Sequence, residues 1–115
     1  LVDNPAHNPR RDFALDADGH VHSDGDARLT FSGIGVYRAA LLADWRTIIG
    51  EVAGTELTPP RFKLAPLLRA AMGRGAVTGT HHQGRWTDVG TPDRLQTLGA
   101  ELRSSKVNGT DHAPL

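Results

Sequence analysis

The chain has 115 residues, of which 38% are hydrophobic, and its 13 basic and 13 acidic side chains give a formal net charge of +0. This balance creates no field that favours nucleic acid or an anionic membrane surface as a partner. The sequence holds no cysteine, which excludes disulfides, thiolate zinc sites and cysteine nucleophiles and favours a reducing compartment such as the cytoplasm.

The start of the chain lacks the pattern of a targeting segment. Residues 1–5 (LVDNP) do not begin with Met and do not join a charged region to an apolar one, so no signal peptide is expected. No apolar run reaches the roughly 18 residues that a membrane-spanning helix needs. An apolar pair that enters an Asp-Asn-Pro turn is typical of a strand leading into a loop, and we expect the chain to begin inside a fold.

The first part of the chain is predicted to be rich in β-structure. Asp12–Asp16 alternates like a short strand, Ala17–His20 has the Asp-Gly chemistry of a hairpin turn, and Val21–His22 begins the return strand. Leu29–Arg38 is the strongest strand candidate because it is rich in β-forming residues.

The helices and the remaining strands follow. Ala39–Trp45 is predicted to form one short helix, and Phe62–Met72 a longer one that starts near a proline and ends at glycine. Its apolar face is expected to comprise Leu64, Leu67, Leu68 and Ala71.

The C-terminal part alternates again between strand and helix. Ala76–His81 and Arg85–Val89 are predicted strands, and Thr91 is expected to cap a helix that runs from Pro92 to about Leu102. Residues 104–115 are expected to form a disordered tail. This order of elements predicts an α/β fold with some antiparallel pairing.

Histidines offer one candidate for metal binding. His20 and His22, with Asp24 nearby, could form a metal cluster, but the spacing lacks a fourth ligand of zinc type and favours a solvated hairpin. The pair His81-His82 would point its rings to opposite faces of a strand, which favours a plain surface role.

Asp88 is the more informative candidate. It stands at the end of a predicted strand, before a Gly-Thr turn and a helix that begins with proline. Ligands of open α/β sheets bind at such strand ends, and a carboxylate there suits a hard cation such as Mg²⁺. The pattern leaves open whether Asp88 binds metal or is an ordinary turn residue.

The segment at 86–91 (WTDVGT) resembles the W-x-D-x-G-T signature near the C-terminus of sugar-1-phosphate nucleotidylyltransferases. Four upstream segments occur in the order expected for that family, namely 1–5 (LVDNP), 12–15 (DFAL), 29–34 (LTFSGI) and 62–68 (FKLAPLL). Together they resemble the bacterial branch that contains N-acetylmuramate-1-phosphate uridylyltransferases and proteins labelled mannose-1-phosphate guanylyltransferase. The likeness covers nearly all of residues 1–103.

This resemblance implies a fold and a reaction. Residues 1–103 would be the C-terminal, sugar-binding half of a Rossmann-like nucleotide-diphospho-sugar transferase fold with a mixed sheet. The missing N-terminal half would carry the Gly-rich phosphate loop, a catalytic Lys and the first metal-binding Asp, so the isolated chain is expected to be inactive. In the family reaction a sugar 1-phosphate attacks a nucleoside triphosphate, an NDP-sugar forms and pyrophosphate leaves. Muramate would connect the reaction to cell-wall recycling, with mannose and glucose as alternatives.

The resemblance also assigns roles to residues. Asp88 would be the catalytic, second carboxylate of a Mg²⁺ site. The residues implied at the sugar site or beneath the metal ligand are Asn4, Thr30, Ser32, Gly33 and Trp86. One departure is Arg11, which stands before Asp12-Phe13 where the family usually has glycine.

A second reading makes the chain a non-catalytic half-domain. Without a triphosphate-binding loop it would serve as a small sugar-binding or structural module. A half-sheet would expose unpaired strand edges, so the isolated chain is then expected to be marginally stable or to associate.

Overall fold

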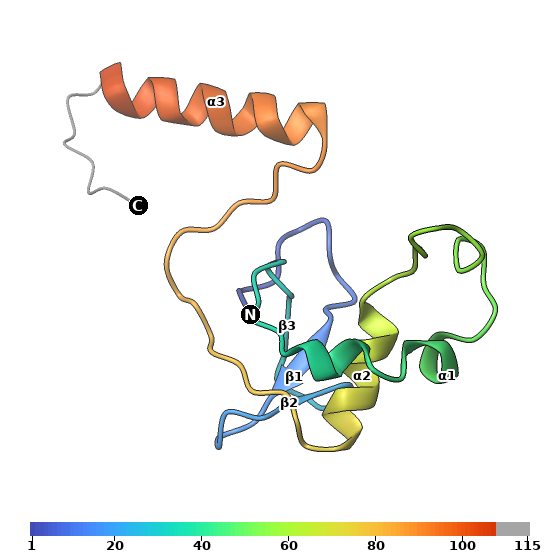
Figure 1. The fold of residues 1–115 in the computed structure, drawn as a ribbon. Coiled ribbons are helices and arrows are strands. Elements are labelled where there is room, and N and C mark those ends of the chain that lie inside the picture. Colours follow the sequence, from blue (N-terminus) through green and yellow to red (C-terminus); the bar gives the residue numbers. More distant parts are fainter. Residues whose placement is uncertain (108–115) are drawn as a thin grey trace. The chain divides into compact units, whose positions relative to one another are not determined.

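A computed structural model of the chain describes residues 1–107. These residues fall into two compact units, Leu1–Gln83 and a second that begins at Gly84. The elements of the first unit are β1 (Phe13–Leu15), β2 (Val21–His22), β3 (Arg28–Leu29), the 3-10 helix η1 (Ala39–Leu42), α1 (Trp45–Ile49) and α2 (Ala65–Gly73) (Figure 1). The second unit holds α3 (Pro92–Val107).

A small antiparallel sheet organises the first unit, with the strand order β2-β1-β3. Its hairpin is the predicted one, because Leu15 pairs with Val21 and Ala14 pairs with His22. The Asp16 side chain closes the turn, since its Oδ1 accepts the backbone N–H groups of Asp18 and His20, each at 2.9 Å. The local turn chemistry therefore sets the register of β1 and β2.

The predicted mixed sheet is not formed by these three strands, which pair only antiparallel. A parallel contact occurs as the isolated bridge between Val2 and His82, beside the antiparallel bridge between Val2 and Thr30. The described residues therefore have a mixed α/β composition with an antiparallel sheet. The wider Rossmann-like arrangement stays a prediction.

The prediction of a long strand at Leu29–Arg38 is wrong beyond its first residues. Leu29 ends β3 and Thr30 makes a single bridge, but residues 31–38 hold no strand. Ile34 is 79% exposed and Val36 is fully exposed. Strands are stabilised by hydrogen bonds to a neighbouring strand and by burial of one face. Apart from Phe31, which packs against the core, this segment obtains neither within the described residues.

Neither of the two later strand predictions gives a regular strand. Within Ala76–His81 only Thr78 forms a bridge, to His20, and residues 85–89 hold no strand. Ala76–His81 nonetheless has a backbone partner, because the Val21 N–H donates to the Val77 carbonyl at 3.0 Å and the Gly79 N–H donates to the Gly19 carbonyl at 2.9 Å.

The predicted helix at Phe62–Met72 is confirmed as α2. Its expected face is buried or half-buried, and Pro66 lies in the first turn. Past its last residue, the Ala76 N–H donates to the Ala71 carbonyl and the Gly75 N–H donates to the Met72 carbonyl, with Gly75 at φ 68°. This pair of bonds is a Schellman motif, which explains the glycine at the helix end.

The other helices differ in length from their predictions. The helix expected at Ala39–Trp45 is only the short 3-10 helix η1, and a separate helix, α1, begins at Trp45. Helix α3 starts at Pro92 as predicted but continues to Val107, so residues 104–107 of the expected tail are helical. The rest of that tail, 108–115, lies outside the described residues. Within the described part, no helix is long and apolar enough to cross a membrane.

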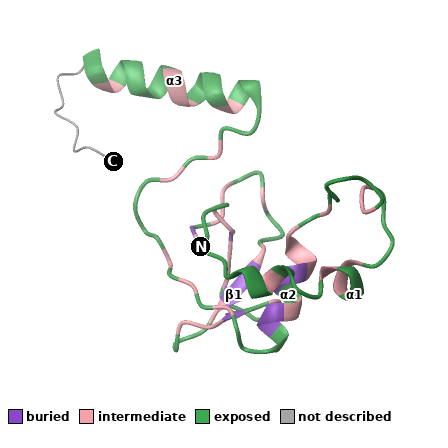
Figure 2. Ribbon diagram, viewed as in Figure 1, coloured by how far each residue is buried: buried purple, intermediate pink, exposed green. Residues whose placement is uncertain are grey.

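The core lies between the sheet and α2 (Figure 2). Its buried cluster consists of Phe13, Val21, Leu68 and Met72. Leu67 is completely buried. Around the cluster pack the half-buried side chains Leu1, Leu15, Phe31, Leu41, Leu64 and Val77. Burial of these apolar groups supplies the main stabilisation of the first unit.

Candidate functional site

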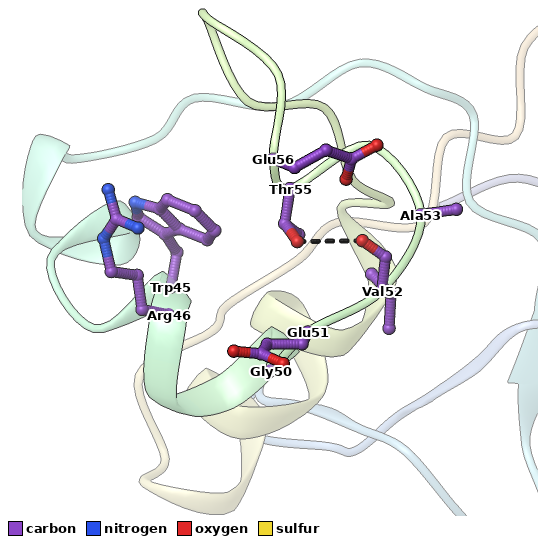
Figure 3. A pocket seen from close by; sticks show the side chains of 8 residues that line it. All are labelled: Trp45, Arg46, Gly50, Glu51, Val52, Ala53, Thr55 and Glu56. Atoms are coloured by element: carbon purple, nitrogen blue, oxygen red, sulfur yellow. Dashed lines mark hydrogen bonds between the residues drawn. The ribbon is translucent and has the colours of Figure 1, made fainter.

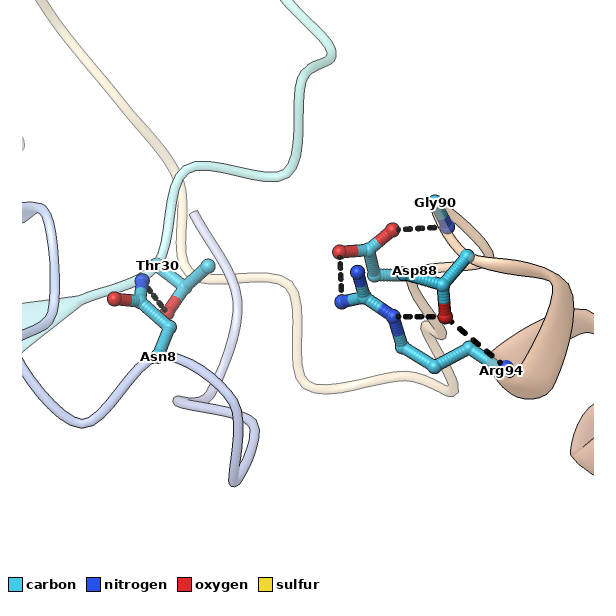
Figure 4. Close-up of polar contacts among 6 residues, drawn as sticks. Asn8, Thr30, Asp88, Gly90 and Arg94 are labelled. Carbon is cyan, nitrogen blue, oxygen red and sulfur yellow. Dashed lines mark hydrogen bonds and ion pairs between the residues drawn. The ribbon is translucent and has the colours of Figure 1, made fainter.

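Asp88 lies in the turn that precedes α3, and its carboxylate is held on both oxygens (Figure 4). Oδ1 accepts the backbone N–H of Gly90 at 2.7 Å, and Oδ2 accepts Nη1 of Arg94 at 2.7 Å. The Asp88 and Arg94 side chains are each 32% exposed. The orientation of the carboxylate is therefore fixed by contacts within the second unit.

Thr91 caps the helix, as predicted. Its Oγ1 accepts the backbone N–H of Arg94 at 3.2 Å, which satisfies one of the donors that a helix start leaves unpaired. Pro92 occupies the first helical position and Asp93 adds an acidic group to the first turn. The sequence signals of a helix start thus place Asp88 immediately before the positive end of α3.

The surroundings of Asp88 differ from the prediction in one respect. The sequence placed Trp86 and Asp88 at the end of a strand, but residues 85–89 form no strand in the described chain. Trp86 is half-buried. The turn and the Arg94 contact, rather than a sheet edge, orient the carboxylate here.

The donor chemistry at Asp88 fits a share in a Mg²⁺ site. Carboxylate oxygen is a hard ligand, and protein sites for Mg²⁺ often use one or two carboxylates with substrate phosphates and water. Among residues 1–107 no group of three His, Cys, Asp or Glu side chains is placed to hold a metal by itself. Asp88 can therefore contribute one ligand to a site that other groups complete.

A second group of polar side chains lies in the first unit, around Thr30. The buried Thr30 hydroxyl donates to Oδ1 of Asn4 at 2.9 Å and accepts from Nδ2 of Asn8 at 3.1 Å (Figure 4 draws the Asn8 contact). Asn4 also donates to the carbonyl of Arg28 at 3.0 Å. The structure thus joins Asn4 and Thr30, two of the expected sugar-site residues, and uses the Thr30 hydroxyl inside this network.

Asn8 and Asp12 complete the network, and sequence reasoning gave them no role in a site. Asp12 accepts the backbone N–H of Phe31 at 2.7 Å through Oδ2 and the amide of Asn8 at 3.1 Å through Oδ1. Asp12 lay in a family-like segment, which was a usable signal. Asn8 stood in a turn-rich stretch that gave no signal.

Ser32 and Gly33 follow the buried Thr30 and are more exposed than it is: Ser32 is half-buried and Gly33 is exposed. The Ser32 hydroxyl accepts the backbone N–H of Ile34 at 3.3 Å. Gly33 has φ 86°, and a Cβ placed there would meet nothing within 4 Å. Glycine is therefore required at this position for the left-handed backbone rather than for lack of space.

The backbone at residue 11 has a conformation that favours glycine. Arg11 has φ 63°, the left-handed region that a residue with a side chain adopts at a cost. A glycine, which the family resemblance implies at this position, adopts this conformation freely. Arg11 is exposed, so the chain accepts backbone strain at this position without burying the side chain.

Two histidines pair with aspartates instead of forming a metal cluster. His22 Nε2 lies 2.7 Å from Oδ2 of Asp16, and His81 Nε2 lies 2.7 Å from Oδ1 of Asp3. The hydrogen bond from His22, followed by the backbone N–H of His20, lowers the pKa of Asp16 below its ordinary value of 3.8. These contacts support the interpretation of residues 16–22 as a solvated hairpin.

One open pocket of about 600 Å³ lies beside α1 (Figure 3). Its lining is Trp45, Arg46, Gly50, Glu51, Val52, Ala53, Thr55 and Glu56. The Trp45 ring already stacks on the Phe62 ring, with the two ring centroids 4.8 Å apart. The Arg46 guanidinium lies over the Trp45 ring, with its Cζ 4.5 Å from the ring centroid. Glu56 accepts the Gly54 N–H at 2.9 Å. These groups are used by the loop itself, so the pocket gives no specific indication of a ligand.

No model of a known protein family matches the chain. The chain is 43% identical over 98 residues to N-acetylmuramate alpha-1-phosphate uridylyltransferase of Neisseria meningitidis serogroup B. The matched region is 84% of this chain and 38% of that relative, so the chain spans less than half of the relative's length. With the ordered motifs at residues 1–5, 12–15, 29–34, 62–68 and 86–91, this similarity supports one assignment. The chain belongs to the sugar-1-phosphate nucleotidylyltransferase family.

Proposed function

We propose that this chain is the sugar-binding part of a uridylyltransferase that acts on N-acetylmuramate 1-phosphate. The observation that carries the proposal is the 43% identity over 84% of the chain to a protein of that name. A muramate substrate would place the reaction in cell-wall recycling. Triphosphate substrates and the absence of cysteine fit a cytoplasmic enzyme.

In the proposed reaction a phosphate oxygen of the sugar 1-phosphate attacks the α-phosphorus of UTP. The new P–O bond forms as the bond from the α-phosphorus to the bridging oxygen breaks, and pyrophosphate leaves with that oxygen and its electron pair. Such transfers depend on positioning and on neutralisation of charge. A bound Mg²⁺ would supply part of this neutralisation.

Asp88 is the residue of this chain that we assign to the metal. Its carboxylate is oriented before any ligand arrives, because Gly90 and Arg94 fix its two oxygens. The start of α3 follows it in the sequence, and the positive end of the helix dipole favours a nearby anion. Together these features support a role for Asp88 beside a phosphate group.

The sugar side is assigned to the Thr30 region. Asn4 and Thr30 bond to each other and hold the backbone from which Ser32 and Gly33 project. We propose that the first two residues support the sugar site and that the latter two face the sugar. Trp86 is assigned a packing role near Asp88.

The remaining part of the domain is the proposed partner. Residues 31–38 have the sequence of a strand but lack one, and Ile34 and Val36 expose most of their side chains. A strand from the nucleotide-binding part would satisfy these backbone groups and cover the apolar side chains. The same part would bring the phosphate loop, the catalytic Lys and the first metal-binding Asp.

The test is complementation followed by substitution of Asp88. The chain is assayed for pyrophosphate release from UTP and N-acetylmuramate 1-phosphate, alone and with the separately expressed remainder of the meningococcal relative. We expect turnover only in the mixture. Asp88→Asn should lower it by at least about a hundredfold, as for other groups that stabilise transition-state charge.

Asp93→Asn is the matched control, because it removes the same charge from the same helix start. Turnover within about twofold of the unsubstituted mixture is expected for it. Near-normal turnover in Asp88→Asn would contradict the assignment of Asp88 to the metal.

The alternative function is a sugar-binding or structural half-domain without catalysis. It is favoured by one observation, that Asp88 and Thr30 are both engaged by groups of this chain. Saturable binding of N-acetylmuramate 1-phosphate by the chain, with no turnover in the complemented mixture, would support this alternative.

A further inference from the structure

Arg94 makes three contacts that tie the first turn of α3 to Asp88. Its Nη1 donates to Oδ2 of Asp88 at 2.7 Å, and its Nε and backbone N–H donate to Oγ1 of Thr91 at 3.1 and 3.2 Å. The guanidinium is therefore anchored to the Thr91 hydroxyl on one side and to the carboxylate on the other. A planar group held at two points has little freedom to turn, so it fixes the direction of the carboxylate.

The absence of a side chain at Gly90 allows the Asp88 carboxylate to lie close to the backbone. A Cβ added to Gly90 would lie 2.9 Å from Oδ1 of Asp88 and 3.5 Å from Nη2 of Arg94. The first distance is shorter than real Cβ atoms make, so a side chain at this position would displace the carboxylate. The ion pair therefore folds closely over the Gly90 backbone, which also donates its N–H to the carboxylate.

We propose that Arg94 is the positioning residue of Asp88 and its resident counter-ion, and that a divalent cation must compete with the Arg94 guanidinium for Oδ2. This inference rests on the proposed role of Asp88 as a metal ligand. Two positive groups at one carboxylate oxygen repel each other. Arg94 thus lowers the metal affinity of the free protein while it keeps the carboxylate in the orientation that a metal needs.

The test uses Mn²⁺ as the probe and NMR spectra of the 115-residue chain as the readout. Mn²⁺ broadens the amide signals of residues near the place where it binds, so titration gives an affinity at residues 88–91. Arg94→Gln should bind Mn²⁺ about two- to fivefold more tightly than the unsubstituted chain, the size expected for a partly exposed ion pair. Arg94→Lys keeps the charge but not the two-point anchor. Its Mn²⁺ affinity should lie between those of the unsubstituted chain and Arg94→Gln.

Arg85→Gln is the matched control. It removes one positive charge from the same unit, where Arg85 pairs with Glu101 at 3.4 Å. Its Mn²⁺ affinity should match that of the unsubstituted chain. An equal gain in Arg85→Gln and Arg94→Gln, or no gain in Arg94→Gln, would overturn the competition.

The metal-free spectrum separates this inference from the proposed function. Without metal, Arg94→Gln should shift the Gly90 amide and the Asp88 carboxyl carbon, whereas Arg85→Gln should leave both in place. Unchanged signals in Arg94→Gln would overturn the positioning role. If instead Asp88→Asn leaves the Mn²⁺ broadening intact, the metal role of Asp88 and the competition both fail, and the metal-free shifts decide the positioning role alone.

Discussion

Helices α2 and α3 begin with similar local signals but differ in burial and in role. Both have proline in their first turn. In α2 a full face is buried, namely Leu67, Leu68, Ala71 and Met72. In α3 no residue of the described range is buried, and Leu95 is 57% exposed. One helix therefore holds a core together, whereas the other presents capping and charged groups next to Asp88.

This contrast teaches that helix formation and helix burial have separate causes. Proline, the Thr91 cap and acidic first-turn residues favour a helix without any tertiary contact. Burial requires a second apolar surface, which β1 and β2 provide for α2. Stability is therefore expected to reside in the first unit, and substitutions in the second to affect mainly the site.

The most direct way to break the contrast is to shorten one leucine in each helix. Leu67→Ala removes a completely buried side chain, and we expect it to lower the free energy of unfolding by about 2–5 kcal/mol. Leu95→Ala is the matched substitution in α3 and should change it by less than about 0.5 kcal/mol. Urea unfolding followed by circular dichroism measures both. Equal losses would show that α3 contributes to the core as much as α2.

A second test concerns the polar network of the first unit. Thr30→Val keeps the shape of the side chain but leaves Oδ1 of Asn4 and Nδ2 of Asn8 without their hydroxyl partner. We expect a loss of about 1–3 kcal/mol in the free energy of unfolding. Ser32→Ala is the control in the same segment and should cost less than about 0.5 kcal/mol. A small effect of Thr30→Val would mean that the network orders the region without stabilising it.

A third test changes backbone strain alone. Arg11→Gly relieves the left-handed conformation at φ 63° and should raise the free energy of unfolding by about 1 kcal/mol. Arg10→Gly, at the neighbouring exposed position, controls for the added flexibility and should be neutral or slightly destabilising. A melting temperature that falls in Arg11→Gly would contradict the strain.

The smallest expected effect is the dependence of hairpin stability on pH. The contacts from His22 and the backbone lower the pKa of Asp16 in the folded chain. The charged carboxylate therefore contributes stability above about pH 4, and this contribution is lost as the pH falls through the lowered pKa. Asp16→Asn should remove it, so the stability difference from the unsubstituted chain should shrink between about pH 5 and pH 2.

Asp18→Asn, in the same turn, controls for the loss of one negative charge. Thermal unfolding at several pH values would reveal the difference. A difference between Asp16→Asn and the unsubstituted chain that stays constant over this range would contradict the role of the His22 contact.

Part of the site could be predicted from the sequence because its signals are local. Asp88 and the Thr91 cap follow from a short motif, and both have the contacts expected of a turn before a helix. Arg94 escaped notice because its role depends on the path of its side chain back across the turn. Asn8 escaped for a similar reason, since it meets Thr30 across 22 positions of sequence.

Local sequence signals suffice to predict the hairpin at residues 13–22, the helix α2 with its glycine end, and the capped start of α3. Each depends on hydrogen bonds and dihedral preferences among residues a few positions apart. Only the tertiary structure decided which extended segments became strands. Residues 31–38 and 85–89 have the right side chains, but a strand needs a backbone partner that sequence alternation cannot supply. The difference in burial between α2 and α3 also depends on tertiary structure. An apolar helix face is buried only where another surface lies against it.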